Sequence, residues 1–190
     1  VAHMGFVMLA IAALTTAGVN AAIFGMVAHG LITGLLFFVA GSVQHAYHTR
    51  EMSRLGGLLT QAPKMGWILG FCAMASLGLP GLAGFWGEFP ALLAAFQPAD
   101  GLSESLFRTY MVIGGLGTVL AAGYLLWMLQ KVAFGEPKPE FADAHIHDVS
   151  VFEWIAWTPI LLLIVVLGIF PNIIFSVTDP AVLRIMAPFS

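Results

Sequence analysis

One carboxylate lies in a long apolar stretch of this sequence. Glu88 is the only acidic residue between Met65 and Ala99, and that stretch contains no Lys or Arg. A charged acid at the centre of a membrane costs roughly 2.5–3.5 kcal/mol, so it faces protein or water there, or becomes neutral. Because such a group can take up and release a proton, the sequence predicts that Glu88 belongs to a proton relay. The alternative is that Glu88 only fixes helix contacts by hydrogen bonding.

The residues around Glu88 predict an irregular backbone. Pro80-Gly81 interrupts the apolar run, and Gly84 and Gly87 allow close backbone approach. Pro90 has no N–H to donate within a helix. Unpaired backbone at membrane depth is tolerated where it is buried in protein or lines a water-filled cavity, and broken helices recur in transporters. We therefore expect an interrupted helix beside Glu88.

Two histidines in apolar segments are candidate partners of Glu88. His29 has Gly25 and Thr33 one helical turn away, so a small and polar stripe shares its face. An imidazole changes charge near neutral pH, so His29 can relay protons, although a structural role fits its surroundings equally well. His3 lies in a similar setting nearer the first residue.

For the other histidines, the sequence predicts no catalytic or metal-binding role. His45 and His48 lie where an apolar segment gives way to a polar loop, as expected for polar residues at headgroup level. His145 and His147 precede Asp148, but three ligands without a second cluster make a poor zinc site, so no metal is expected.

The composition is that of an integral membrane protein. Of 190 residues, 59% are hydrophobic and 9% charged, against about 45–50% and about 25% in soluble domains. The net charge is −3 with no basic block, which argues against nucleic acid as a partner. Cys72 is the single cysteine, and we expect it to be a buried packing residue. Because Val1 begins within an apolar pattern, we expect a piece of a longer protein.

Apolar runs separated by polar loops predict an all-α polytopic bundle. A membrane helix needs about 20 apolar residues, so the uncharged first 49 residues should hold two helices, separated around 15–20. The six expected segments are 1–14, 21–45, 65–79, 85–96, 109–130 and 152–170. We expect residues 1–175 to form the transmembrane bundle and residues 176–190 a tail with a short surface helix that starts at Asp179-Pro180.

Local signals refine two of these segments. Ser150 and Glu153 fit a capping box at the start of the last span. Glycines in the fifth segment are expected to serve close helix packing. These glycines are Gly114, Gly115, Gly117 and Gly123.

Four motifs together resemble the antiporter-like membrane subunits of respiratory complex I. They are AHMGF at 2–6, AHGL at 28–31, HTREMSRLGGL at 48–58 and SLGLPGLAGFWGEF at 76–89. The resemblance implies that Glu88 is the acid of the interrupted helix, and that His29 and His3 belong to a hydrophilic axis through the membrane. The sister chains L and N carry a lysine at the position of Glu88, which sets this sequence apart from them.

The resemblance also implies a function. The chain would be the second half of an antiporter-like bundle in a proton-pumping NADH:quinone oxidoreductase, acting as a non-redox subunit. NADH, FMN, the iron–sulfur clusters and quinone would be held by partner subunits, with no cofactor in this chain. Its partners would be chains L and N and membrane lipid, in a bacterial plasma membrane. The alternatives are a subunit of a multi-subunit cation/proton antiporter and a structural spacer.

Overall fold

In the residues that the computed structural model describes, which are 1–142, 144 and 146–187, every regular element is a helix. The all-α expectation is therefore confirmed. The helices are α1 (Ala2–Ala12), α2 (Thr16–Tyr47), α3 (Leu58–Gln61), α4 (Pro63–Ser76), α5 (Ala83–Phe96), α6 (Glu104–Val132), α7 (Val151–Ile169) and α8 (Asn172–Met186).

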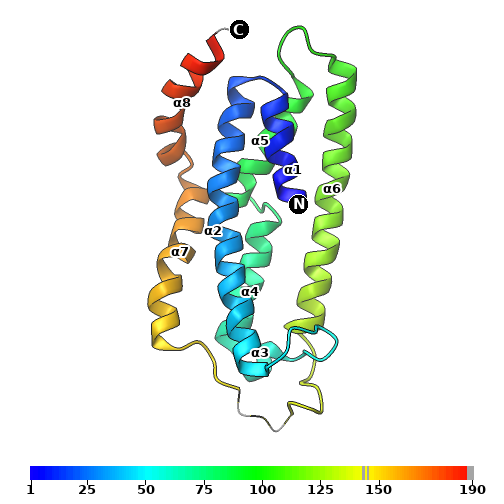
Figure 1. Cartoon of the computed structure of the whole chain (residues 1–190), viewed down its shortest axis with the longest axis vertical. Helices are drawn as coiled ribbons and strands as arrows, with labels where there is room; N and C mark the ends of the chain where they lie inside the picture. The colour runs from blue at the N-terminus through cyan, green and yellow to red at the C-terminus, as the bar shows by residue number, and fades with distance from the viewer. Residues whose placement is uncertain (143, 145, 188–190) are drawn as a thin grey trace.

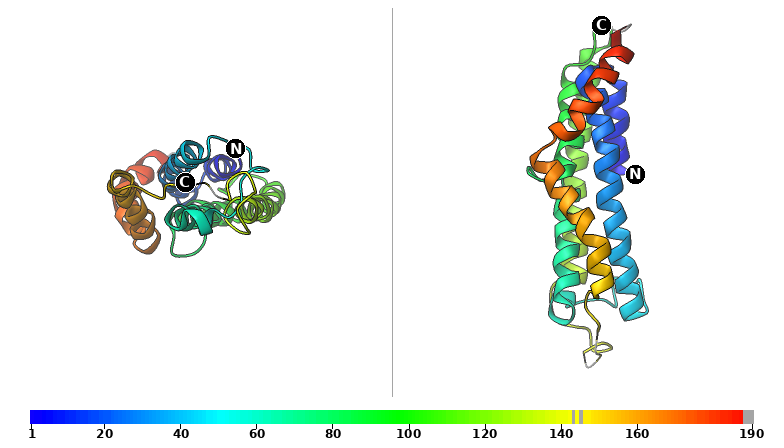
Figure 2. Two further views of the ribbon diagram at one scale, coloured as in Figure 1. Left: turned by 90° about the horizontal axis from the view of Figure 1, so that it is seen from below. Right: turned by 90° about the vertical axis from the view of Figure 1, so that its left-hand side faces the viewer.

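The helices form an elongated bundle around α2, which runs along most of its length (Figure 1). α4 and α5 follow one another alongside α2, and the chain between them is the expected interruption. Figure 2 shows α6 on one side of the bundle and α7 with α8 on the other. α2 packs against α1, α4, α5, α7 and α8, and so holds the bundle together.

Among the described helices, three are each long and apolar enough to cross a membrane. These are α2, α6 and α7. The outer face of α6 is strongly apolar, with Leu120 73% exposed and Val119 67% exposed. Such a face suits lipid or further protein better than water. Cys72 is fully buried in the main core, as expected.

The first break in the chain lies earlier than expected. Thr15 caps α2 by accepting a hydrogen bond from the Gly18 amide at 3.0 Å, so Gly18 and Asn20 lie inside the helix. Asn20 is buried and donates to Asp179 of α8 at 2.6 Å, while its amide oxygen accepts from Thr178 at 2.7 Å. A polar side chain that ordinarily breaks helices here joins two of them.

The C-terminal helix, α8, begins earlier than expected. Asp179 and Pro180 lie inside α8, so the expected helix start at Asp179 is wrong. The carboxylate of Asp179 serves Asn20 rather than a helix cap. The division of the chain at residue 175 stays a prediction, and α8 runs across that position.

The expected capping box is present at the start of α7. The Ser150 hydroxyl accepts from the Glu153 amide at 3.3 Å, and the Glu153 carboxylate accepts from the Ser150 amide at 2.7 Å. The glycines of α6 follow expectation only at Gly114, where an added Cβ would lie 3.0 Å from Leu92. Cβ atoms at the other three would meet nothing within 4 Å, so those glycines do not serve packing among the described residues.

Polar contacts tie the loop before α7 to the start of α4. Both oxygens of Asp148 accept backbone amides, from Lys64 and Met65, each at 3.0 Å. Nearby, the Arg54 guanidinium pairs with Glu140, and this hydrogen bond lowers the pKa of the Glu140 carboxyl. The loop is thus attached to α4 by a cap supplied from a distant part of the sequence.

Replacing Asp148 with Ala should destabilise the protein by about 1 kcal/mol, because two amides at the start of α4 lose their acceptor. The measurement is the melting temperature of the purified complex that contains the full-length chain. Asp148→Asn keeps one acceptor oxygen, so its melting temperature should fall between those of the unsubstituted protein and Asp148→Ala. Glu136→Ala in the same loop is the control, and a melting temperature for Asp148→Ala equal to that of the control would contradict this role.

Candidate functional site

The three residues singled out in the sequence meet at mid-height in the bundle. His3 on α1 places its Nδ1 2.7 Å from Oε1 of Glu88 on α5. The imidazole of His29 on α2 lies beside that of His3, with ring centroids 5.9 Å apart. The side chains of His3 and Glu88 are only 21% and 14% exposed. Helices from three separate parts of the chain therefore build one titratable cluster.

A contact between two glycines sets the position of Glu88. A Cβ added at Gly87 would lie 2.5 Å from the Cα of Gly25, which is closer than real Cβ atoms approach. α5 and α2 therefore touch through their backbones one residue before Glu88. Glycine at position 87 permits this approach, whereas a Cβ at Gly25 would make only ordinary contact with Gly87 at 3.4 Å. The approach brings Glu88 to the level of His29.

The interruption between α4 and α5 lies against the carboxylate. α4 ends at Ser76, and Gly78 has a φ of +66°, a left-handed conformation that favours glycine. A Cβ at Gly78 would lie 2.8 Å from Oε2 of Glu88. Pro90 lies inside α5, so the helix also lacks one amide donor two residues beyond the acid.

The interruption also contacts the far end of α7. The indole N–H of Trp86 donates to the Gly168 carbonyl at 2.8 Å. A Cβ at Gly168 would lie 2.5 Å from the Cα of Leu82 and would clash with the Gly81 carbonyl. The last turn of α7 thus lies next to the chain between α4 and α5.

A cavity of about 30 Å³ adjoins the cluster. A water molecule needs about 10–15 Å³ by the same measure, so the cavity has room for water. Its lining includes all three titratable residues together with Thr33 and Ser76, which carry hydroxyl groups. Ser76 is not among the residues singled out from the sequence, although it is one of very few polar residues in the run from Met65 to Ala99.

This arrangement can hold and pass a proton. A proton between His3 and Glu88 can reside on Nδ1 of the imidazole or on Oε1 of the carboxyl, because either atom can donate to the other. An imidazole can accept a proton at one ring nitrogen and release one at the other. The cluster therefore supports acid–base chemistry within an apolar bundle.

The remaining histidines lie away from this cluster. His45 and His48 are exposed at the end of α2, with ring centroids 6.5 Å apart. His147 is exposed in the loop before α7, and His145 lies outside the described residues. Among the residues that the structure describes, no group of three or more His, Cys, Asp or Glu could hold a metal ion.

Comparison with known proteins gives a family match over most of the chain. Residues 1–126 match the family described as NADH:quinone oxidoreductase/Mrp antiporter, transmembrane. Among the relatives, NADH-quinone oxidoreductase subunit M of Rhodobacter capsulatus is 37% identical over 186 residues, covering 98% of this chain and 35% of the relative. NAD(P)H-quinone oxidoreductase chain 4 of a Nostoc species is 35% identical over 188 residues, covering 98% of this chain and 35% of the relative.

Two solved structures share the fold. Respiratory complex I from Thermus thermophilus with bound NADH contains a chain that superposes with a TM-score of 0.87 at 26% identity, covering 99% of this chain and 38% of that one. The Mrp complex from a Dietzia species gives a TM-score of 0.79 at 18% identity, covering 98% and 41%, which shows a shared fold alone. The chain spans about a third of the length of the curated relatives that it matches.

Proposed function

This chain belongs to the NADH:quinone oxidoreductase/Mrp antiporter transmembrane family, and from that premise we propose that it translocates protons as part of subunit M of complex I. It is an integral membrane protein, as its family and its three apolar helices indicate. The relatives named NADH-quinone oxidoreductase subunit M support this assignment over a cation/proton antiporter.

The hydrogen bond between His3 and Glu88 is the observation that carries the proposal. A proton arriving at Glu88 is donated from Oε1 to Nδ1 of His3, which leaves a carboxylate beside an imidazolium. The imidazolium then releases a proton from its other nitrogen, and His29 accepts it through water in the adjoining cavity. The backbone turn at Gly78 lies against the carboxylate and limits the space into which it can move.

In this proposal the chain contributes no redox chemistry of its own. NADH, FMN, iron–sulfur clusters and quinone are bound by other subunits, and electron transfer there changes the charge near Glu88. The neighbours are the antiporter-like chains L and N, together with lipid. The setting is a bacterial plasma membrane, a location supported by the bacterial relatives.

Purification of the full-length chain from its native membrane tests the assignment. Flavin, iron–sulfur clusters and NADH:quinone reductase activity should co-purify with the tagged chain. An unrelated membrane protein that carries the same tag is the control. Recovery of a flavin-free complex whose vesicles exchange Na⁺ for H⁺ would overturn the proposal in favour of the antiporter.

A further inference from the structure

A second polar site lies at the opposite end of α2 from Thr15, well away from the Glu88 cluster. A cleft of about 720 Å³ opens between the last turns of α2 and the first turns of α4 and α7. Phe37 and Phe38 line one part of it, and Ser42, His45 and Glu153 line another. The two phenylalanines are 74% and 50% exposed. The cleft therefore joins an open apolar surface to a polar one.

The two parts of the cleft lie at different depths along α2. With a rise of 1.5 Å per residue, Phe37 and Phe38 lie about 8–10 Å from the middle of this helix. Ser42 and His45 lie about 16–20 Å from it by the same rise. Half of a hydrocarbon core measures about 15 Å. With the middle of α2 placed at the bilayer centre, the aromatic part lies at acyl-chain depth and the polar part at headgroup depth. This is the layering of a phospholipid.

The charges in the cleft favour an amine-bearing headgroup. Among the described residues that line it, the ionisable groups are histidines and the carboxylates of Asp148 and Glu153, without Lys or Arg. A headgroup with net negative charge would face both carboxylates without a fixed cation. A headgroup that carries both an ammonium and a phosphate meets acids with the first and imidazole N–H groups with the second.

The carboxylates retain unused acceptor capacity. Oε1 of Glu153 accepts from the Ser42 hydroxyl, while Oε2 accepts from Ser150. Oδ2 of Asp148 accepts from the Lys64 amide. Each carboxylate oxygen can accept two hydrogen bonds, so, counted over the hydrogen bonds of the described residues, Oε1 and Oδ2 can each take one more. A primary ammonium donates three hydrogen bonds, whereas a quaternary choline nitrogen donates none.

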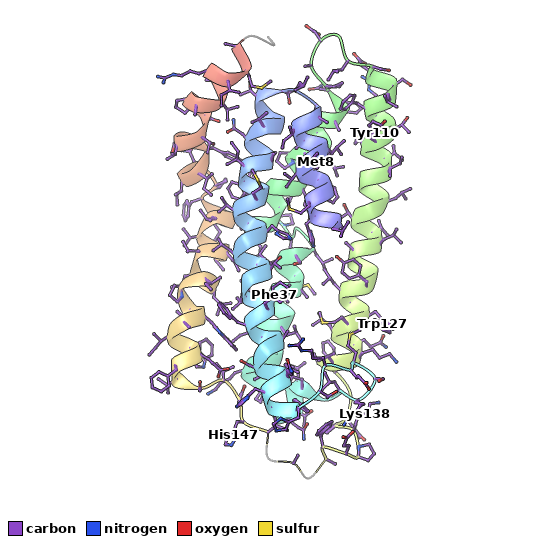
Figure 3. The ribbon with its side chains drawn as sticks, viewed as in Figure 1. Met8, Phe37, Tyr110, Trp127, Lys138 and His147 are labelled. Atoms are coloured by element: carbon purple, nitrogen blue, oxygen red, sulfur yellow. The ribbon has the colours of Figure 1, made fainter. Side chains whose placement is uncertain are left out.

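We propose that this cleft binds a phospholipid with an ethanolamine headgroup. The ammonium donates to Glu153 and Asp148, the phosphate accepts from the imidazole of His45, and the acyl chains lie over Phe37 and Phe38. Figure 3 shows Phe37 part of the way along α2 and His147 near its end, beside the start of α7. The lipid would span the distance between these two levels and fill the groove between α2 and α7.

The test measures lipid bound to the purified complex that contains the full-length chain. After delipidation, rebinding of phosphatidylethanolamine, phosphatidylcholine and phosphatidylglycerol is quantified by mass spectrometry. Glu153→Gln should weaken ethanolamine-lipid rebinding about ten-fold through loss of a charge-assisted hydrogen bond, with the other lipids unchanged. Glutamine preserves the capping box at the start of α7. His45→Leu, which leaves that box untouched, should weaken rebinding as well.

A control and a cross-linking measurement identify what fills the cleft. Gln130→Ala removes an exposed polar residue of α6 at the end of the bundle that holds the cleft. This variant should leave the rebinding of all three lipids unchanged. A photoreactive side chain at Phe38 should capture ethanolamine lipid. Unchanged rebinding in both variants, an equal loss of all three lipids, or capture of polypeptide by the photoreactive side chain would each overturn the proposal.

Discussion

Replacing Glu88 with Gln is expected to reduce proton translocation by about 10²-fold or more while the complex still assembles. Glutamine is nearly isosteric and its amide can still hydrogen-bond to His3, so the local packing is preserved. An amide, however, does not ionise near neutral pH, and a positioned acid or base typically contributes 10²–10⁴-fold to proton transfer. The loss therefore falls on the proton step rather than on the fold.

The measurement is proton uptake by sealed vesicles that contain the assembled complex, compared with its NADH oxidation. Glu104→Gln is the matched control, since Glu104 is an exposed acid that pairs with Arg108 on α6. If the Glu88 variant pumps like this control, Glu88 only fixes helix packing and the relay is wrong. His3→Gln should produce a similar defect, because it removes the partner of the acid.

The second large effect is expected at Gly87. In Gly87→Ala the new methyl group would lie 2.5 Å from the Cα of Gly25, so α2 and α5 must separate. Overpacking of this kind costs about 1–3 kcal/mol, and Gly87→Leu should abolish stable assembly. A separation would also move Glu88 away from His29, so any folded Gly87→Ala protein should translocate protons more slowly.

Folding at this position is read from the yield and melting temperature of the purified complex. Gly30→Ala and Gly34→Ala on α2 are the controls, because an added Cβ at either position meets nothing within 4 Å. Equal melting temperatures for Gly87→Ala and these controls would show that the helices can separate at no cost, against the interpretation given above.

The members of the site were predictable, but their contacts were not. An acid in an apolar run is expensive, so Glu88 stood out from its surroundings alone. The surroundings of His29 fitted a structural role equally well, and it was the resemblance to complex I subunits that placed His29 and His3 beside Glu88. The hydrogen bond between His3 and Glu88 joins residues 85 positions apart, and periodicity within a segment carries no information about such pairing. Ser76 was missed because a serine at a helix end has many ordinary uses.

In the fold, too, the elements were predictable from local signals, whereas the contacts between distant residues were not. Helix positions followed from hydropathy and from the loop residues between segments, and the interruption at Pro80-Gly81 was found where the sequence placed it. The start of α2 was misplaced because Gly18 and Asn20 are weak helix formers, and local propensity yields to tertiary contacts. The bonds of Asn20 with Asp179 and Thr178 are such contacts.

The contact between Gly168 and Gly81 brings two breaks in the helices close to one level of the bundle. Chain without continuous helical hydrogen bonds bends more easily than helix, and here the α4–α5 joint contacts the last turn of α7, just before the α7–α8 joint. The bond from Trp86 to Gly168 joins α5 to α7, so a tilt of α5 would be transmitted to α7, while α2 runs unbroken past both. Glu88 sits at that pivot, so a small rocking of the lower helices would re-aim its carboxylate.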